Sequence, residues 1–132
     1  ACAEMLAREG ARVILTQRHE EEGRKVASSI RDQGLQAAFV AQDVTREDDW
    51  EHVLEETRKN FGQPDILVNN AGIQVEKTVI ESTDSDWDLV IGANCRGVFN
   101  CCRAFIPNIR AGGSIVNIGS ISGMVAVQSM AL

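Results

Sequence analysis

The stretch Asp-Ile-Leu-Val-Asn-Asn-Ala-Gly at residues 65–72 decides how this sequence is interpreted. It begins as a short apolar run, which is typical of a buried strand, and then changes abruptly to two amides and a glycine. Amides directly after a buried strand need hydrogen-bonding partners, and Gly72 permits another backbone or a ligand to approach closely. The stretch therefore predicts a strand at 65–69 that ends in a binding loop.

Similar apolar runs lie on both sides of this stretch, and amphipathic segments separate them. We expect strands at 12–16, 37–41, 65–69 and 114–118. We expect helices at 19–33, 45–61 and 83–105, and an opening helix with Cys2, Met5 and Leu6 on one face. Alternation of strands and helices is typical of a parallel sheet with crossover helices, and the short loops indicate one domain over residues 1–132.

The helix expected at 45–61 has the clearest periodicity. Trp50, Val53 and Leu54 fall on one face, and Thr45 with Asp48 has the spacing of a capping pair. Gly62 and Pro64 are expected to end this helix before the next strand.

The long helix expected at 83–105 carries one polar residue on its apolar stripe. Thr83 and Asp86 are expected to cap it, and the stripe includes Trp87 and Phe99. Asn94 shares that stripe, so its carboxamide is expected to point inward, where it must be hydrogen-bonded. A structural amide and a functional amide are both consistent with this position.

Composition excludes several classes of protein. A net charge of -6 and a pI near 4.9 argue against a nucleic-acid partner, because phosphate binding needs a basic face. No apolar run has the length of a membrane span and no secretory signal is recognisable, so we expect no membrane partner and a cytoplasmic location. The four cysteines form no CxxC pair, so neither a metal site nor a disulfide framework is expected.

All four predicted strands end in polar or glycine residues, at 16–18, 42–44, 69–72 and 118–120. Ligands of open parallel sheets bind in the crevice beyond the carboxyl ends of the strands. These strand ends therefore predict a ligand site, although strands of this kind end in polar loops in any case.

The octet at 65–72 resembles the NNAG strand end of the short-chain dehydrogenase/reductase family. Asp43-Val44, the helix around Asn94 and Gly97, and the segment 113–120 resemble further family segments in the same order. The resemblance covers the whole chain. It implies a Rossmann-type α/β fold, a doubly wound parallel sheet in three α/β/α layers, here incomplete because the family's first strand and its glycine-rich loop would precede Ala1.

The resemblance also implies roles for individual residues. Asp43 is similar to the family residue that accepts from the adenine amino group, and Val44 to the residue that flanks that ring. Asn70, Ala71 and Gly72 resemble the segment beside the cofactor ribose. Asn94 resembles the asparagine of a proton relay, and Ser120 the serine that polarises the substrate carbonyl, with Ser122 as the weaker match.

Cofactor choice depends on the end of the strand at 12–16, where NAD-preferring proteins carry an acid. Gln17 stands there instead, and Arg18 follows it. A guanidinium binds a 2′-phosphate through paired hydrogen bonds, so we expect NADP(H), with NAD(H) as the alternative. Arg18 is also consistent with a surface residue that offsets Glu20, Glu21 and Glu22.

The family's catalytic tyrosine falls thirteen positions after the serine, and this chain ends twelve residues after Ser120. The resemblance implies that the intact protein is an oxidoreductase for a small alcohol or ketone, a homotetramer built through the long helix, and that this chain alone is inactive. The alternative is a non-catalytic cofactor-binding or sensor protein on the same fold. A Tyr-x-x-x-Lys sequence beyond Leu132 would favour the enzyme.

Overall fold

The computed structural model describes residues 1–125, 128 and 132. Its main elements are, in order, α1 (Cys2–Arg8), β1 (Val13–Gln17), α2 (Glu20–Arg31), β2 (Ala37–Ala41), α3 (Glu47–Phe61), β3 (Ile66–Asn69), α4 (Asp84–Ile91), α5 (Gly97–Phe105) and β4 (Ser114–Asn117). Every strand and helix expected from the sequence is present. The boundaries differ from the expected ones by a few residues.

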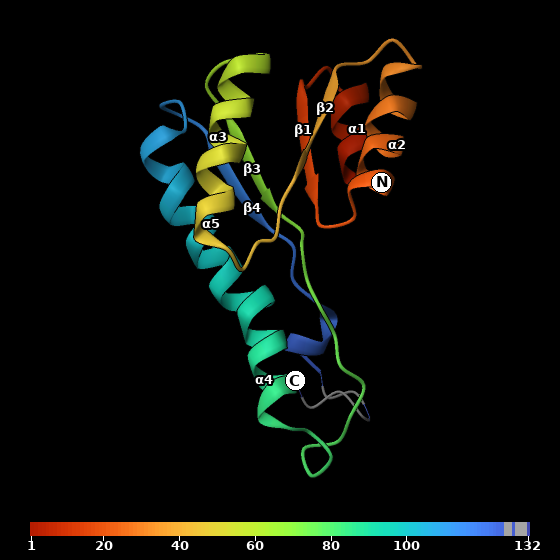
Figure 1. The fold of residues 1–132 in the computed structure, drawn as a ribbon, viewed down its shortest axis with the longest axis vertical. Coiled ribbons are helices and arrows are strands. Elements are labelled where there is room, and N and C mark those ends of the chain that lie inside the picture. The colour runs from red at the N-terminus through yellow and green to blue at the C-terminus, as the bar shows by residue number, and fades with distance from the viewer. Residues whose placement is uncertain (126–127, 129–131) are drawn as a thin grey trace.

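The strands form two parallel pairs. β1 pairs with β2 from Val13↔Ala37 to Gln17↔Ala41, and β3 pairs with β4 from Ile66↔Ser114 to Asn69↔Asn117. Helices lie on both sides of the strands: α1 and α2 cover one face of β1 and β2, and α3 and α5 lie on the other side with β3 and β4 (Figure 1). The arrangement is a layer of strands between two layers of helices.

Alternate residues of β1 contribute to separate hydrophobic clusters. Val13 and Leu15 pack with α1 and α2, against buried Ala7 and Ile30, whereas Ile14 packs toward α3. The cluster on the α3 side is larger and comprises Val40, Trp50, Val53, Leu54, Leu67, Cys101 and Phe105. A strand buried on both faces is typical of doubly wound sheets, because helices cover both sides.

Close packing of α2 on β2 depends on one glycine. Gly23 is buried, and a side-chain carbon at that position would overlap the ring of Phe39. Ala27 and Ile30 continue the inward face of α2, whereas Val26 is 44% exposed. Met5 of α1 is 68% exposed, whereas Ala7 of the same helix is buried.

The capping pair expected at Thr45 and Asp48 is not formed. Thr45 donates from both its hydroxyl and its backbone N–H to Oδ1 of Asp43, at 2.7 and 2.9 Å. Helix α3 begins at Glu47, and its N-cap Arg46 makes no side-chain cap. Trp50, Val53 and Leu54 are buried as expected. The capping box expected at Thr83 and Asp86 is confirmed.

The long helix is interrupted by a π-helical turn at Gly92–Arg96 between α4 and α5. Its buried residues are Val90, Ala93, Gly97, Asn100, Cys101 and Phe105. Trp87 and Phe99, which were expected on the inward stripe, are 54% and 60% exposed. The small residues Ala93 and Gly97 face the core instead: a carbon added to Gly97 would lie 3.0 Å from Cγ2 of Val44.

The two strand pairs face each other across a gap, with β1 on one side and β3 on the other (Figure 1). Residues of both strands line a single large cavity between them. Each of these two strands therefore has an edge of backbone groups without a neighbouring strand among the described residues. Unpaired strand edges cost free energy when buried and promote association when exposed.

We expect the 132-residue chain on its own to aggregate or to unfold without a cooperative transition, because the β1 and β3 edges have no partner strand. Calorimetry and analytical ultracentrifugation of the purified chain measure this directly. A monomer with a single sharp unfolding transition would contradict the expectation.

Candidate active site

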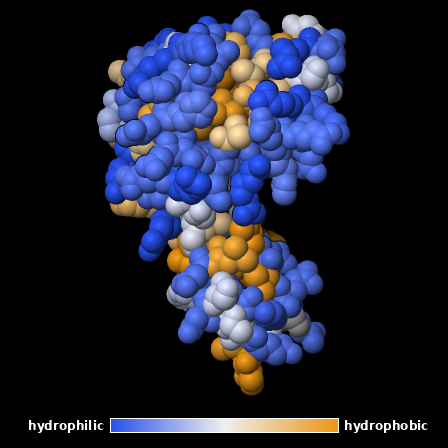
Figure 2. All heavy atoms as spheres, viewed as in Figure 1, coloured by the Kyte–Doolittle hydropathy of each residue, from blue (hydrophilic) through white to orange (hydrophobic). Residues whose placement is uncertain are grey.

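A cavity of about 1680 Å³ lies between the two strand pairs and extends past the carboxyl ends of β1, β2 and β3. Figure 2 shows apolar side chains in the furrow between the two halves of the larger lobe. The residues 16–18, 42–45 and 69–73 line this cavity at the strand ends. All six predicted cofactor residues, Arg18, Asp43, Val44, Asn70, Ala71 and Gly72, are among them.

Asp43 is held in place by its neighbours. Its backbone N–H donates to Oδ2 of Asp49 at 2.8 Å, and Oδ1 accepts both hydrogen bonds from Thr45. The Thr45 hydroxyl lowers the pKa of Asp43 below its ordinary value, and Arg18 and Arg46 lower it further, while desolvation opposes them. The carboxylate is therefore ionised at neutral pH and can accept a further hydrogen bond from a ligand.

A hydrogen bond from the Trp50 side chain holds the backbone at Val44 in place. The indole Nε1 donates to the carbonyl oxygen of Val44 at 3.3 Å, and Trp50 itself is buried against the ring of Phe105. Because the indole is packed in the core, the loop after β2 has a rigid support. Val44 therefore presents a fixed apolar surface to the cavity.

The amide of Asn69 joins the two strands of the second pair. Its Nδ2 donates to Oδ1 of Asn117 at 2.8 Å and lies 3.6 Å from Sγ of Cys102. This satisfies the amide that the sequence places at the end of a buried strand. Asn70 is exposed and turns the other way, with Oδ1 3.9 Å from Sγ of Cys2. Both residues line the cavity, and of the two amides Asn69 is the one that bridges β3 and β4.

Asn94 binds the loop after β3 rather than pointing into the core. Its Nδ2 donates to the carbonyl oxygen of Ile73, and its Oδ1 accepts from the Ile73 backbone N–H, both at 2.8 Å. The residue is exposed and lies outside the cavity lining, so the expected inward orientation is wrong. The contact holds the loop two residues from Ala71, and a carbon added to Gly72 would lie 3.5 Å from Oδ1 of Asn94.

The π-helical turn gives Asn94 a second feature. Within it the backbone N–H of Gly97 donates to the carbonyl oxygen of Gly92, five residues earlier. Turns of this kind are rare and concentrate at functional sites, because they disturb the regular pairing of backbone carbonyls. Asn94 lies at the centre of the turn. In the sequence, the position of Asn94 on the expected apolar stripe was the signal for this feature.

Ser120 lies three residues beyond β4 and is exposed. Its Oγ accepts from the backbone N–H of Ser122 at 3.1 Å and donates to Oγ of Ser122 at 3.2 Å. Ser120 thus caps the short helical turn Ile121–Gly123. Neither serine lines the large cavity, so the structure does not bring Ser120 together with Asn70 in one cavity.

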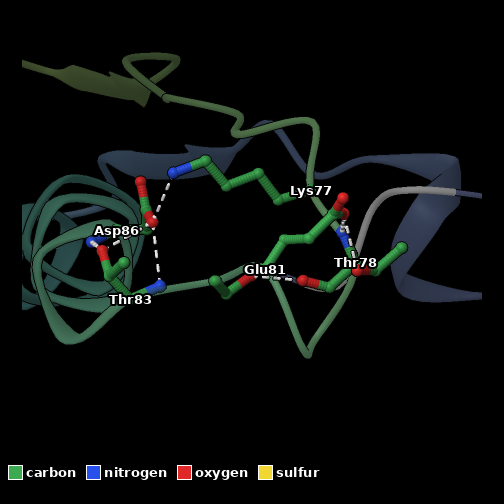
Figure 3. A network of polar contacts seen from close by, with 6 residues as sticks. Lys77, Thr78, Glu81, Thr83 and Asp86 are labelled. Atoms are coloured by element: carbon green, nitrogen blue, oxygen red, sulfur yellow. Dashed lines mark hydrogen bonds and ion pairs between the residues drawn. The ribbon is translucent and has the colours of Figure 1, made fainter.

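A polar network fixes the segment between β3 and α4, and sequence reasoning found only half of it. Figure 3 shows Lys77 extending to Asp86, and its Nζ donates to Oδ2 of Asp86 at 2.7 Å. The same Oδ2 accepts from the Thr83 backbone N–H at 2.9 Å and from the Thr83 hydroxyl at 2.7 Å. Glu81 accepts from the backbone N–H and the hydroxyl of Thr78 at 3.0 and 2.6 Å. The network anchors the loop that begins at Asn70 to the start of α4.

We expect this anchor to weaken in acid. Lys77 and Thr83 lower the pKa of Asp86 from 3.8 to about 2, so the stabilisation is complete above pH 3.8 and is lost as pH falls toward about 2. Asp86→Asn should remove this part of the pH dependence of urea unfolding of the intact protein. Asp84→Asn, an exposed change in the same helical turn, is the control. An unchanged pH dependence in Asp86→Asn would contradict the role of the ion pair.

Gln42 was expected only as one of the polar residues of the strand end 42–44. It is 3% exposed and lines the cavity beside Asp43. Neither Nε2 nor Oε1 has a hydrogen-bond partner among the residues that the structure describes. Buried amides are nearly always paired, so this side chain requires an explanation. The only signal in the sequence was its place directly after a strand.

The comparisons with known proteins agree with these features. The model of the family described as short chain dehydrogenase matches residues 1–132, and the chain belongs to this family. A crystal structure of a short-chain dehydrogenase/reductase from Brucella melitensis superposes with a TM-score of 0.91 at 30% identity, covering 98% of this chain and 54% of that one. The expectation of an incomplete Rossmann-type parallel sheet is confirmed.

Curated relatives carry the names of several dehydrogenases. A 3beta-hydroxysteroid dehydrogenase from Mediterraneibacter gnavus is 38% identical over 99% of this chain and 48% of its own length. A cyclopentanol dehydrogenase from Comamonas is 40% identical over 96% of this chain and 52% of its own. An NADP-dependent (R)-specific alcohol dehydrogenase from Lentilactobacillus kefiri is 37% identical over 95% of this chain and 50% of its own length. The chain spans about half the length of these relatives.

Across the described part of the chain, no helix combines the length and the apolar character needed to cross a bilayer.

Proposed function

We propose that residues 1–132 are part of the dinucleotide-binding domain of an enzyme that transfers hydride between NADP(H) and a small alcohol or ketone. The observation that carries this proposal is the common cavity of Arg18, Asp43, Val44, Asn70, Ala71 and Gly72. The names of the relatives, which include cyclopentanol and (R)-specific alcohol dehydrogenases, support an alcohol or the corresponding ketone as substrate.

The cavity suits the adenosine half of such a cofactor. Asp43 is an ionised acceptor for an amino group, Val44 is a fixed apolar wall, and the 70–72 loop offers backbone at a glycine. When bound, the cofactor would supply the hydride, and these residues would orient it.

The preference for NADP(H) rests on Arg18 and its surroundings. The Nε2 of Gln17 donates to the carbonyl oxygen of His19 at 2.9 Å, so this amide is engaged within its own loop. Glu20 pairs with Arg24 and Glu21 with Lys25, each within α2. Glu20 and Glu21 therefore have their own partners, and Arg18, which lines the cavity near the carboxylate of Asp43, provides a cation that favours a 2′-phosphate.

For the chemical step, we propose that the Ser120 hydroxyl donates to the substrate carbonyl and stabilises the developing negative charge. Asn94 would hold the π-helical turn and the 70–73 loop in the geometry of a proton relay. The 132 residues contain no tyrosine to act as the general acid. We therefore propose that this chain alone does not turn over, and that activity belongs to the intact protein.

We further propose a homotetramer built through the long helix, and a cytoplasmic location. Trp87 and Phe99 on this helix and Ile106 in the turn after it are large apolar residues that are exposed, which suits a subunit interface. All four cysteines are free, which fits a reducing compartment. Sedimentation of the intact protein as a monomer would count against the tetramer.

The test of the proposed function is a direct one. The intact protein is titrated with NADPH and with NADH, and then assayed for NADPH-dependent reduction of a panel of small ketones that includes cyclopentanone. Tight NADPH binding and ketone-dependent oxidation of NADPH are expected. Nucleotide binding without turnover of any alcohol or ketone would favour a sensor, and no nucleotide binding would end the proposal.

A further inference from the structure

The segment from Ile73 to Lys77 is attached to the long helix at both of its ends. At one end Asn94 binds the backbone N–H and the carbonyl oxygen of Ile73, at 2.8 Å each. At the other end Nζ of Lys77 donates to Oδ2 of Asp86 at 2.7 Å. Residues 74–76 between the two attachments belong to no helix or strand. The proposed roles use the Asn94 attachment and give none to the Lys77 attachment.

The spacing of the two attachments is similar on the helix and on the segment. Asp86 and Asn94 are eight residues apart, which corresponds to about 12 Å along a helix. Ile73 and Lys77 are four residues apart, which corresponds to about 13 Å of extended chain. An extended segment therefore reaches from one attachment to the other with little slack, and release of Lys77 would give freedom of movement to the chain that follows Ile73.

Asp86 is a fixed attachment point for Lys77. Its Oδ2 also accepts from the backbone N–H and the hydroxyl of Thr83, at 2.9 and 2.7 Å, and its side chain is only 15% exposed. The capping box at the start of α4 holds the same carboxylate in the first turn of the helix. The ion pair therefore joins the 73–77 segment to a rigid element.

No other cation of this stretch can replace Lys77. It is the only basic residue between Ile73 and Ile91, and the acidic residues of the same stretch are Glu76, Glu81, Asp84, Asp86 and Asp88. Loss of the lysine charge would leave the 73–77 segment among like charges, which repel one another. The attachment at Asp86 thus depends on a single side chain.

We propose that Lys77 and Asp86 are positioning residues of the active site, which act through the 73–77 segment on the contact between Asn94 and Ile73. This inference rests on the proposed function, because it assigns Asn94 and the 70–73 loop to the active site. Lys77 is 40% exposed, and ion pairs at such positions contribute modestly to the stability of the whole protein. Their geometric effect is larger, because a misplacement of about 1 Å in an active site costs up to about 100-fold in rate.

The experiment compares Lys77→Met, Lys77→Arg and Asp86→Asn with the wild type, all as the intact protein. Methionine removes the charge of lysine, arginine keeps it, and asparagine keeps an acceptor for the helix cap. Lys59→Met is the matched control, because Lys59 pairs with Glu56 at 3.1 Å within α3. Hydrogen exchange of the Ile73 backbone N–H is measured by NMR. Steady-state rates of ketone reduction with NADPH are measured on the same proteins.

In Lys77→Met and Asp86→Asn the Ile73 N–H is expected to exchange about tenfold faster, because its contact with Asn94 opens more often. The kcat should fall about tenfold, by more than any change in the KM for NADPH. Lys77→Arg should restore both exchange and kcat, and Lys59→Met should match the wild type. The double variant of Lys77→Met and Asp86→Asn should lose no more than either single variant, since the two residues act as a unit.

Wild-type exchange of the Ile73 N–H in both Lys77→Met and Asp86→Asn would overturn the inference, and this measurement needs no turnover. Unchanged kcat in variants that exchange faster would overturn it as well, because the ion pair would then have a structural role alone. In both cases ketone reduction by the wild type leaves the proposed function intact. A wild type that binds no nucleotide or reduces no ketone would overturn the proposed function, and the inference with it.

Discussion

Ser120→Ala should lower the turnover of the intact enzyme by roughly two to three orders of magnitude, the usual effect of removing one donor to a developing oxyanion. In the structure the Ser120 hydroxyl is exposed, and among the described residues it is bonded to Ser122, at 3.1 and 3.2 Å. A substrate oxygen can therefore replace Ser122 as its partner. The affinity for NADPH should change little, because Ser120 lies outside the cavity lining.

Two further variants make this expectation specific. Ser114→Ala, an exposed change at the start of β4, should retain wild-type turnover. Ser122→Ala should cost much less than Ser120→Ala, because Ser120 is the proposed donor to the substrate oxygen. Steady-state rates with a saturating ketone measure all three. Unchanged turnover in Ser120→Ala, or a larger loss in Ser122→Ala, would refute the role given to Ser120.

Arg18→Ala should reduce kcat/KM for NADPH by about 10- to 100-fold and leave kcat/KM for NADH nearly unchanged. A hydrogen bond to a charged group contributes about 1.5–3 kcal/mol, and only NADPH carries the 2′-phosphate. The effect should shrink at high salt, because the exposed guanidinium is screened. Most of the loss in kcat/KM for NADPH should come from a higher KM.

Arg24→Ala is the matched control, because it removes the same charge from the neighbouring helix. Arg24 is paired with Glu20 and stands over the ring of Phe39. It should leave the ratio of NADPH to NADH efficiency close to that of the wild type. A wild-type preference for NADH, or an Arg18→Ala variant with unchanged NADPH efficiency, would overturn the choice of NADP(H).

The sequence predicted the order of strands and helices because that information is local. Trp50, Val53 and Leu54 have the spacing of one helical face, and Gly62 supplies the positive φ of 88° that ends α3. The residues of the cofactor cavity were also predictable. Each lies at the carboxyl end of a strand, and parallel strands bring those ends to one edge of the sheet.

The start of α3 shows why some local patterns fail. Thr45 has the right spacing to Asp48 for a cap, but Asp43 stands two residues earlier and takes both of its donors. The two outcomes use the same hydroxyl, so only one can form. Thr45 bonds to Asp43 rather than to Asp48, because Asp49 also holds the backbone of Asp43 in place. Spacing alone does not reveal such a competition.

Tertiary packing determines which face of the long helix is buried. Hydrophobicity assigned Trp87 and Phe99 to the core, yet the core takes Ala93 and Gly97, because only small residues let the helix approach Val44. That rotation turns Asn94 away from the core and toward the backbone of Ile73. The Ile73 backbone groups that it binds could not be foreseen, because they belong to a loop 21 residues away in sequence.

The sequence by itself determined the family, the order of the elements and the residues at the strand ends, since all of these are properties of short segments. The tertiary structure alone determined which polar groups are hydrogen-bonded. Asn69 is satisfied by Asn117 across β3 and β4, whereas the buried amide of Gln42 has no partner among the described residues. Hydrogen bonding of a buried amide depends on groups distant in sequence, so only the folded arrangement shows which amides are paired.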